Sequence, residues 1–401
     1  MIDAPAVLAR LRATDARTGG RREAWTEPWV AERRELDAQA KAGCPGVEIE
    51  HDAFANTWYV LPGHRTETIL IASHSDCVPG GGWLDGILGL QAGLGVLAAA
   101  SRRGRPERTL AVVDWADEEG TRFGRSLLGS AAATAAFPVA ELASLIAADG
   151  TPATEIVTGF GFDPDALGTP SPRLADVVAA LELHIEQGPR LQAARRAVAA
   201  VSGCLGVRRR RIIFAGTAGH SGSLPMADRR DPVRAAATLL CELFAAAQQA
   251  GGLATAGELS AEPALITAVP ARCRVGLDLR HAELDALDAL DRRTRNLAAA
   301  SVCPVEIAAV YDQDPVHFDP SLVAAARAAS GGGEALVSGP LHDSASLAQA
   351  GVPAAMLFVA SLRGISHTRD EDSAEADLVA GMEALGRLVE PLLAGEATAD
   401  A

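Results

Sequence analysis

The chain has 401 residues, 48% of them hydrophobic and 22% charged, which is enough apolar material for two globular domains. Its formal net charge of −15 argues against binding to nucleic acid or to an anionic membrane surface, because both need an excess of lysine and arginine. Lys41 is the only lysine, which excludes a P-loop and disfavours Schiff-base chemistry. We therefore expect a small-molecule substrate.

The cysteine pattern and the N-terminal stretch bear on the cellular compartment. The six cysteines form no CxxC pair, and the N-terminal stretch has no long apolar core of the kind that secretory signals contain. No apolar run approaches the length of a membrane-spanning helix. These features predict a cytoplasmic protein with reduced thiols that does not associate with a membrane.

Strand-like and helix-like segments alternate along most of the chain. Amphipathic helices are predicted at residues 5–13 and 28–43, and a long helix at residues 86–100. Short apolar runs predict strands at residues 68–72, 109–115, 177–181 and 354–361. The alternation predicts an α/β fold whose central sheet is mainly parallel and flanked by helices.

The middle of the chain has a different pattern. Residues 197–206 are small and are interpreted as a hinge, followed by a β-α-β-β-α-β order whose two middle strands are predicted near residues 264–270 and 273–280. This order predicts an inserted, ferredoxin-like α+β domain over residues 206–313, which we expect to act as a lid and as a dimerisation surface. The catalytic domain would then be discontinuous, comprising residues 1–205 and 314–401.

Polar, metal-binding residues follow several of the predicted strands. His74 ends the first strand and Asp76 comes two residues later, where its carboxylate could accept the second ring N–H of the histidine. Asp85 precedes a glycine and a helix, so its carboxylate could face the same cavity and bridge two ions. Taken alone, His74 is better explained as a hydrogen-bonded histidine at the end of a strand.

Further candidates follow other strands. Glu118 and Glu119 lie in an acidic turn, where one carboxylate could ligate metal while the other handles a proton, although a solvated acidic turn explains a bare pair. In "LELHIEQGP", His184 is expected to share a strand face with Glu182 and Glu186, while Gln187 points elsewhere. His367 in "GISH" completes a nitrogen and oxygen set that suits Zn²⁺, Mn²⁺, Co²⁺ or Ni²⁺.

The whole set resembles the M20-type metallopeptidase superfamily and, within it, the hydantoinase/carbamoylase branch. That branch includes N-carbamoyl-L-amino-acid hydrolases, β-ureidopropionases and allantoate amidohydrolases. The motifs that match in order are "SHSDCVPGGGWLDG", "DEEGTRFGRSLLGS", "ELHIEQGP", "GHSGSLPM", "LDLR" and "GISH", and they cover nearly the whole chain. The histidine of "HIEQGP" distinguishes the branch, because ordinary M20 peptidases have an acidic residue there.

The resemblance implies a binuclear metal centre. His74, His184 and a bridging Asp85 would hold one divalent ion, and Asp85, Glu119 and His367 would hold the other. The implied reaction is hydrolysis of a linear, non-peptide C–N bond in an N-carbamoyl, or ureido, amino-acid-like substrate. It would proceed through a metal-bridging hydroxide.

The remaining roles come from the same resemblance. Glu118 would be the general base, His220 the oxyanion donor that acts across a homodimer formed through the inserted domain, and Arg280 the binder of a substrate carboxylate. Gln187 and Gly364 match positions that contact substrate. Two structural explanations stay open: Arg280 could simply pair with Asp278, and His220 could cap its own turn.

Three positions depart from the family pattern and bear on the substrate. Thr267 stands where the family usually has an asparagine, and Leu341 stands where it usually has a glycine. Trp83 replaces a basic residue. We therefore keep two alternatives open: an N-acyl-amino-acid hydrolase or dipeptidase of the same superfamily, and a catalytically silent metal-binding homologue.

Overall fold

The computed structural model describes residues 2–396, which divide into two compact units. The first unit comprises residues 1–202 and 317–401, within the described range, and the second comprises residues 203–316. The strand β6 (Val198–Cys204) precedes β7 (Gly206–Ala215) by one residue, and β12 (Val305–Gln313) precedes β13 (Val316–His317) by two. The two connections between the units are therefore short.

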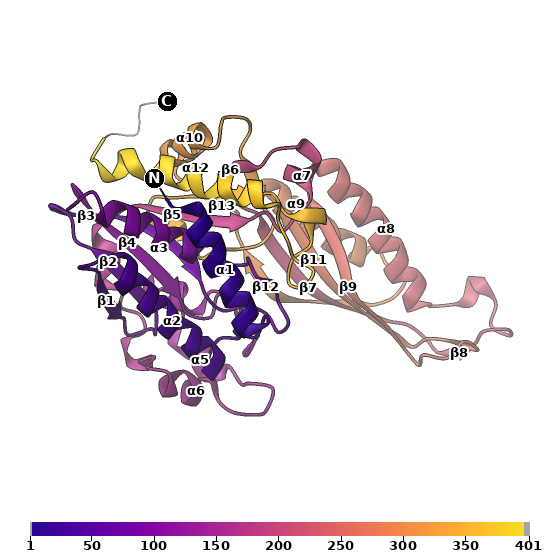
Figure 1. Cartoon of the computed structure of the whole chain (residues 1–401). Coiled ribbons are helices and arrows are strands. Elements are labelled where there is room, and N and C mark those ends of the chain that lie inside the picture. The colour runs from indigo at the N-terminus through magenta and orange to yellow at the C-terminus, as the bar shows by residue number, and fades with distance from the viewer. Residues whose placement is uncertain (1, 397–401) are drawn as a thin grey trace. The chain divides into compact units, whose positions relative to one another are not determined.

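The first unit is built on a nine-stranded mixed sheet (Figure 1). Along the sheet the order is β1-β2-β4-β3-β5-β15-β6-β13, with β14 paired to β6. The four central strands β4, β3, β5 and β15 are parallel, whereas the outer pairs β1–β2, β2–β4 and β15–β6 are antiparallel. Bounds not given above are β1 (Glu48–His51), β2 (Thr57–Leu61), β3 (Arg65–His74), β4 (Arg108–Trp115), β5 (Val177–Ile185), β14 (Leu336–Ser338) and β15 (Ala354–Val359). The prediction of a mainly parallel central sheet in an α/β fold is confirmed.

Helices cover the parallel core of this sheet on both faces. The helices α3 (Ile87–Ser101) and α12 (Glu375–Leu393) pack on one face, with α1 (Ala4–Thr18), α2 (Glu27–Gly43) and α10 (Pro320–Ala329) beside them. The short α11 (Asp343–Gln349) contacts β3, β5 and β15 without belonging to that core, and it packs against α4 (Leu128–Ala133). Smaller helices are α5 (Val139–Ser144), α6 (Ala153–Gly159) and α7 (Arg190–Ala194).

The alternation along β5 decides which side chains face which helices. Leu181, Leu183 and Ile185 belong to the hydrophobic cluster formed with α3 and α12. Because successive side chains of a strand point to opposite faces, Glu182 and His184 lie on the other side. The carboxyl ends of β3, β4, β5 and β15 meet at one edge of the sheet, where polar side chains from these strands gather.

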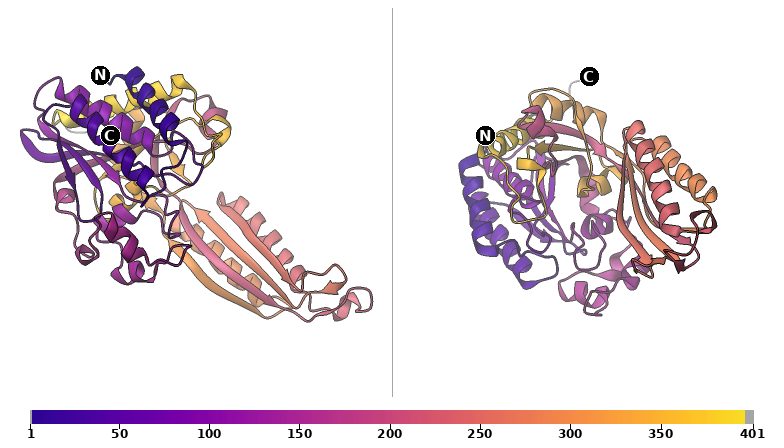
Figure 2. Two further views of the ribbon diagram at one scale, coloured as in Figure 1. Left: turned by 60° about the horizontal axis from the view of Figure 1, so that its bottom comes forward. Right: turned by 90° about the vertical axis from the view of Figure 1, so that its right-hand side faces the viewer.

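The second unit is a four-stranded antiparallel sheet with two helices on one face (Figure 2). Its order is β12-β7-β11-β9, and the helices are α8 (Pro232–Ala250) and α9 (Leu284–Ala299). Residues of β11 (Arg272–His281) alternate, so that Cys273, Val275, Leu277 and Leu279 are buried against the helices. A two-stranded extension pairs β8 (Gly219–His220) with β10 (Ala268–Val269).

One sequence-based strand assignment near this unit is wrong. The second strand of the unit is β9 (Leu253–Glu262), whereas we predicted it near residues 264–270. This edge strand is mostly exposed and carries small and polar side chains, so it has little hydrophobic signal. Residues 198–204 of the predicted hinge form β6, whose small apolar side chains are buried while its backbone pairs with β15.

No helix within residues 2–396 is long and apolar enough to cross a membrane.

Candidate metal centre

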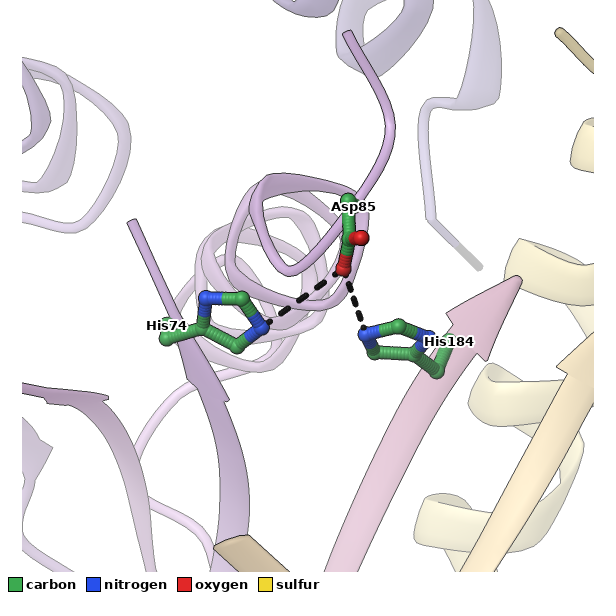
Figure 3. A group of neighbouring side chains, drawn as sticks. All are labelled: His74, Asp85 and His184. Atoms are coloured by element: carbon green, nitrogen blue, oxygen red, sulfur yellow. Dashed lines mark ion pairs between the residues drawn. The ribbon is translucent and has the colours of Figure 1, made fainter. Parts of the chain in front are cut away.

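Three buried side chains of the first unit converge at the carboxyl edge of its sheet (Figure 3). His74 is the last residue of β3, His184 lies near the end of β5, and Asp85 lies just before α3. Asp85 Oδ1 is 3.1 Å from His184 Nε2 and 3.7 Å from His74 Nε2. Ligands of a tetrahedral ion with bonds of about 2.0–2.2 Å lie roughly 3.3–3.5 Å apart, so this spacing suits one divalent ion.

A second group gathers around the other oxygen of the same carboxylate. His367 Nε2 is 3.2 Å from Asp85 Oδ2 and 3.6 Å from Glu119 Oε2. The His367 side chain is half exposed, whereas Asp85 and Glu119 are almost fully buried. Asp85 therefore directs one oxygen to each group, which is the geometry that a bridging carboxylate needs.

Several polar atoms of these groups have no hydrogen-bond partner although they are buried. They are His74 Nε2, His184 Nε2 and Glu119 Oε1. A buried polar atom without a partner is costly, and metal ions bound by the two groups would satisfy these atoms. The residues thus fit two divalent cations, and their mixture of imidazole and carboxylate suits a transition metal or zinc.

A tight backbone turn brings Asp85 to His74. Gly86 has φ +66°, and a Cβ built there would lie 2.4 Å from His74 Cε1. Only glycine tolerates both the left-handed conformation and this close approach. The glycine after Asp85 therefore has a specific steric reason to be present.

The other ring nitrogen of each buried histidine is held by backbone carbonyls. His74 Nδ1 lies 3.2 Å from the Asp76 carbonyl oxygen and 3.5 Å from Asp76 Oδ1, and His184 Nδ1 lies 3.0 Å from the Ile185 carbonyl. These contacts favour the tautomers that direct Nε2 toward the candidate ions. The Asp76 carboxylate also accepts hydrogen bonds from the backbone N–H groups of Glu118 and Glu119, at 3.3 and 3.1 Å.

Glu118 lies beside the first group. Its Oε2 is 3.9 Å from His74 Nε2, and the residue is 8% exposed. Burial raises the pKa of Glu118 well above its ordinary value, although the nearby His74 acts in the opposite direction. Burial likewise raises the pKa of Glu119 to about 7, with the charge of Asp85 adding to the effect.

Gln187 and Glu186 differ from their predicted orientations. Gln187 lies beyond the end of β5 with φ +55°, and its Nε2 donates to Asp85 Oδ2 at 2.8 Å. Glu186 does not face the site, because its carboxylate accepts the N–H groups of Arg190 and Leu191 and thereby caps α7. The strand ends one residue before Glu186, so strand alternation fails there. The role of Gln187 as a substrate contact stays a prediction.

Sequence reasoning missed Glu371, which is 1% exposed. Its Oε1 accepts the N–H groups of Leu84 and Asp85, both at 3.0 Å, and its Oε2 accepts the Ser366 hydroxyl at 2.7 Å. Glu371 therefore ties the segment of Asp85 to the segment of His367. The only signal in the sequence is an acidic residue four positions after "GISH", which by itself suggests nothing.

A further polar group lies behind His184, in which Glu182 was predicted to share the face of His184 while His342 and Ser344 were missed. The ring centroid of His342 is 4.5 Å from that of His184, and Glu182 Oε2 accepts the Ser344 hydroxyl at 2.6 Å. Glu182, His184 and His342 form another arrangement that could hold a metal ion, and all three are buried. Burial, together with the neighbouring His184, lowers the pKa of His342 well below its ordinary value.

The remaining predicted site residues are placed as follows in the first unit. Leu341 is partly exposed and precedes the buried His342. Gly364 has φ +63°, and a Cβ there would lie 2.8 Å from the Gly188 backbone. Close packing against the segment after β5 is therefore sufficient to explain this glycine.

The second unit carries His220, Thr267 and Arg280. His220 is exposed on β8, and its Nδ1 accepts the Gly222 N–H at 3.1 Å. Thr267 is exposed, and its carbonyl accepts the Ser221 N–H at 3.0 Å. Arg280 Nε donates to Asp278 Oδ1 at 2.8 Å, so the pairing kept open from the sequence is present.

Comparisons with known proteins agree with these features. A family model described as Peptidase family M20/M25/M40 matches residues 70–391. An N-carbamoyl-L-amino acid amidohydrolase from Geobacillus stearothermophilus is 34% identical over 363 residues, 88% of each chain. An allantoate amidohydrolase from Bacillus subtilis (strain 168) is 30% identical over 378 residues, 91% of this chain and 90% of the relative.

A solved structure is similar over the full length. The crystal structure of an amidase of the hydantoinase/carbamoylase family from Burkholderia multivorans has a TM-score of 0.89 at 28% identity and covers 99% of both chains. The α/β sheet with histidines and carboxylates at its carboxyl edge defines the class, a hydrolase with a candidate binuclear centre. The chain belongs to Peptidase family M20/M25/M40, as its motifs predicted.

Proposed function

We propose that this chain is a metal-dependent amidohydrolase that cleaves the C–N bond of an N-carbamoyl, or ureido, amino-acid-like small molecule. The curated relatives are amidohydrolases of N-carbamoyl amino acids and of allantoate. The observation that carries the proposal is the Asp85 carboxylate, whose two oxygens face two separate ligand groups. That arrangement supports hydrolysis more than silent binding of a single ion.

Five residues would hold the metals. His74 and His184 would bind one ion, Glu119 and His367 the other, and Asp85 would bridge them. Two bound divalent ions would lower the pKa of a water molecule and polarise the carbonyl that it attacks. The ligand chemistry fits Zn²⁺, Mn²⁺, Co²⁺ or Ni²⁺.

Glu118 would move the proton. Its carboxylate lies beside His74 without being part of either ligand group, so it is placed to accept a proton from the attacking water. Its raised pKa makes it a better base than an exposed glutamate and lets it return the proton to the leaving nitrogen. In a carbamoyl substrate the products would be the free amine and carbamate, which breaks down to ammonia and carbon dioxide.

The second unit would supply substrate recognition. His220 would donate to the developing oxyanion, and the planar guanidinium of Arg280 would bind the substrate carboxylate. The exposed position of His220 on β8 supports a role toward another molecule, and we propose that it serves the site of a partner subunit in a homodimer. Gln187, Thr267, Leu341 and Gly364 would shape the remainder of the pocket.

A substrate panel tests the reaction. The purified protein is stripped with a chelator, reloaded with Mn²⁺, Co²⁺ or Zn²⁺, and assayed with N-carbamoyl, N-acetyl and N-formyl amino acids, allantoate and a dipeptide. We expect ammonia release from a ureido substrate. Turnover of acyl substrates alone would instead support the N-acyl-amino-acid hydrolase or dipeptidase, which the departures at Thr267 and Leu341 would permit.

A mixing experiment tests the role of His220 across a dimer. His220→Ala and Glu118→Gln are each expected to be nearly inactive. If His220 acts on the partner, a mixed dimer contains one complete site, so random exchange of subunits in a 1:1 mixture restores about one quarter of the wild-type activity. No recovery after verified subunit exchange would contradict the shared site.

A further inference from the structure

An irregular segment between α1 and α2 contains unusually large buried side chains. Arg22 and Trp25 are both 0% exposed, and Trp29 in the first turn of α2 is 1% exposed. Trp25 has φ +62°, a conformation that a bulky side chain rarely adopts. A left-handed tryptophan is retained where its surroundings hold it in place, so the contacts of this linking segment (residues 20–26) reveal what it supports.

The linking segment is hydrogen-bonded to the turn that follows His74 (residues 75–81). Arg22 Nε donates to the Ser75 carbonyl at 2.9 Å, and the Cys77 N–H donates to the Arg22 carbonyl at 3.2 Å. Ser75 and Cys77, which form these two hydrogen bonds, directly precede and follow Asp76. Trp29 Nε1 adds a bond to Ser75 Oγ at 3.1 Å.

The same segment is hydrogen-bonded to the acidic turn (residues 117–122). Trp25 Nε1 donates to Asp117 Oδ2 at 2.6 Å, and Asp117 Oδ1 accepts the Gly120 N–H at 3.1 Å. Arg122 Nη1 also donates to the Trp25 carbonyl. Asp117 directly precedes Glu118 and Glu119, so the indole fixes the carboxylate that shapes their turn.

The two turns are also hydrogen-bonded to each other, because the Asp76 carboxylate accepts hydrogen bonds from the backbone N–H groups of Glu118 and Glu119. We propose that the linking segment positions the metal centre, with Trp25 holding the turn of Glu118 and Glu119 and Arg22 holding the turn of Asp76. Both are positioning residues, because neither belongs to a ligand group. This inference rests on the proposed metal centre but concerns residues that no motif identified.

The buried guanidinium of Arg22 has a second effect. Its Nη1 and Nη2 atoms are buried and have no hydrogen-bond partner, so neither atom is paired with a carboxylate. Arg22 is hydrogen-bonded to Ser75 and Cys77, the two neighbours of Asp76, and both Asp76 and Asp117 are fully buried. A buried positive charge there offsets part of the electrostatic cost of gathering these acids.

Trp25→Phe is the sharpest test, because it keeps an aromatic ring and removes the indole N–H. Trp58→Phe is a matched control: Trp58 is 1% exposed, and its Nε1 donates at 2.9 Å to Asp52 Oδ2, which belongs to neither turn. Each variant, stripped of metal, is titrated with Zn²⁺ against a competing chelator and with Co²⁺ followed by its visible absorption. Unfolding by urea is measured alongside.

We expect Trp25→Phe to weaken metal binding by about tenfold or more and to change the Co²⁺ spectrum, as loss of an outer-shell partner does. Trp58→Phe should lose stability without losing metal affinity. Unchanged affinity in Trp25→Phe, or equal weakening in both variants, would overturn the positioning role of Trp25.

Arg22→Met and Arg22→Lys test the second residue in the same assay. We expect Arg22→Met to weaken binding and Arg22→Lys, which keeps the charge, to recover part of the loss. Wild-type affinity in a folded Arg22→Met would overturn the role of Arg22. The wild-type titration separates the two proposals: a wild-type protein that binds no Zn²⁺ refutes the metal centre itself, whereas the comparison between variants decides the role of the segment.

Discussion

The two units handle buried and clustered charge in opposite ways. In the second unit, carboxylates form ion pairs with arginines. Arg210 pairs with Asp291 and Asp312, and Arg208 pairs with Asp288 and Asp314. At the carboxyl edge of the first unit, Asp85, Glu118 and Glu119 are buried, and the cationic groups near them are histidines.

This difference shows what each unit requires. A carboxylate that pairs with an arginine needs no further cation, so the charges of the second unit are sufficient among themselves. Carboxylates that gather around imidazoles, with nitrogen and oxygen atoms left without hydrogen bonds, instead leave places that fit a cation from solution. The pattern of charge pairing thus separates a structural network from a metal centre.

Asp85→Asn should have the largest effect, because it removes the charge that faces both ligand groups. We expect fewer than two bound ions and a loss of kcat/KM beyond the roughly 10–100-fold typical of outer-shell partners. Metal analysis and kinetics check this. Asp319→Asn is a control, since Asp319 only caps α10. Two tightly bound ions in Asp85→Asn would refute the bridging role.

Glu118→Gln should lower kcat by about 10²–10⁴-fold, the usual contribution of a general base, while leaving the metal content unchanged. Glu186→Gln is the matched control, because Glu186 is similarly buried just beyond the end of β5 but caps α7. It should cost stability and little activity. An unaffected rate in Glu118→Gln would remove it as the base.

Arg210→Met tests the other side of the comparison. Arg210 is 3% exposed, and its loss leaves Asp291 and Asp312 without their guanidinium, so we expect about 1–3 kcal/mol less stability. Arg211→Met, at the exposed neighbour, should stay within about 0.5 kcal/mol. Urea unfolding followed by circular dichroism measures both. A change in metal affinity would contradict the separation of the two networks.

The smallest expected effect is a dependence of stability on pH. Burial and the charge of Asp76 raise the pKa of Asp117 to about 8, and the pKa of Glu119 is raised to about 7. A carboxyl whose folded pKa is raised binds more protons when folded, so the chelator-stripped first unit should lose stability as pH rises from about 4 to 8.

The second unit should respond with the opposite sign. Burial acts to raise the pKa of Asp278, but Arg280 and Arg209 hold it below its ordinary value, so its contribution is lost only as pH falls below about 4.

All five tryptophans lie in the first unit, so fluorescence-detected melting reports that unit. Saturating Zn²⁺ should remove the part of this pH dependence that comes from Glu119, because a ligating carboxylate stays deprotonated. A pH dependence that metal leaves unchanged would count against Glu119 as a ligand.

Much of this protein could be inferred from the sequence because the signals were local. The strand before His74, the helix after Gly86 and the glycine-rich turns have periodicity or backbone requirements that short segments express. The motif set likewise identified the family, which the family model confirms. The edge strand β9 was misassigned and β6 was not predicted as a strand, because what makes them strands is pairing with distant segments.

The sequence by itself determined the ligand candidates, because histidines and acidic residues that follow predicted strands can be identified from the sequence alone. Only the tertiary structure decided which atoms meet: the two oxygens of Asp85 face different groups, Glu186 turns away, and Glu371 and Trp25 hold the turns that carry the ligands. The reason is physical, because hydrogen bonds between residues tens or hundreds of positions apart leave no periodic signal in the sequence.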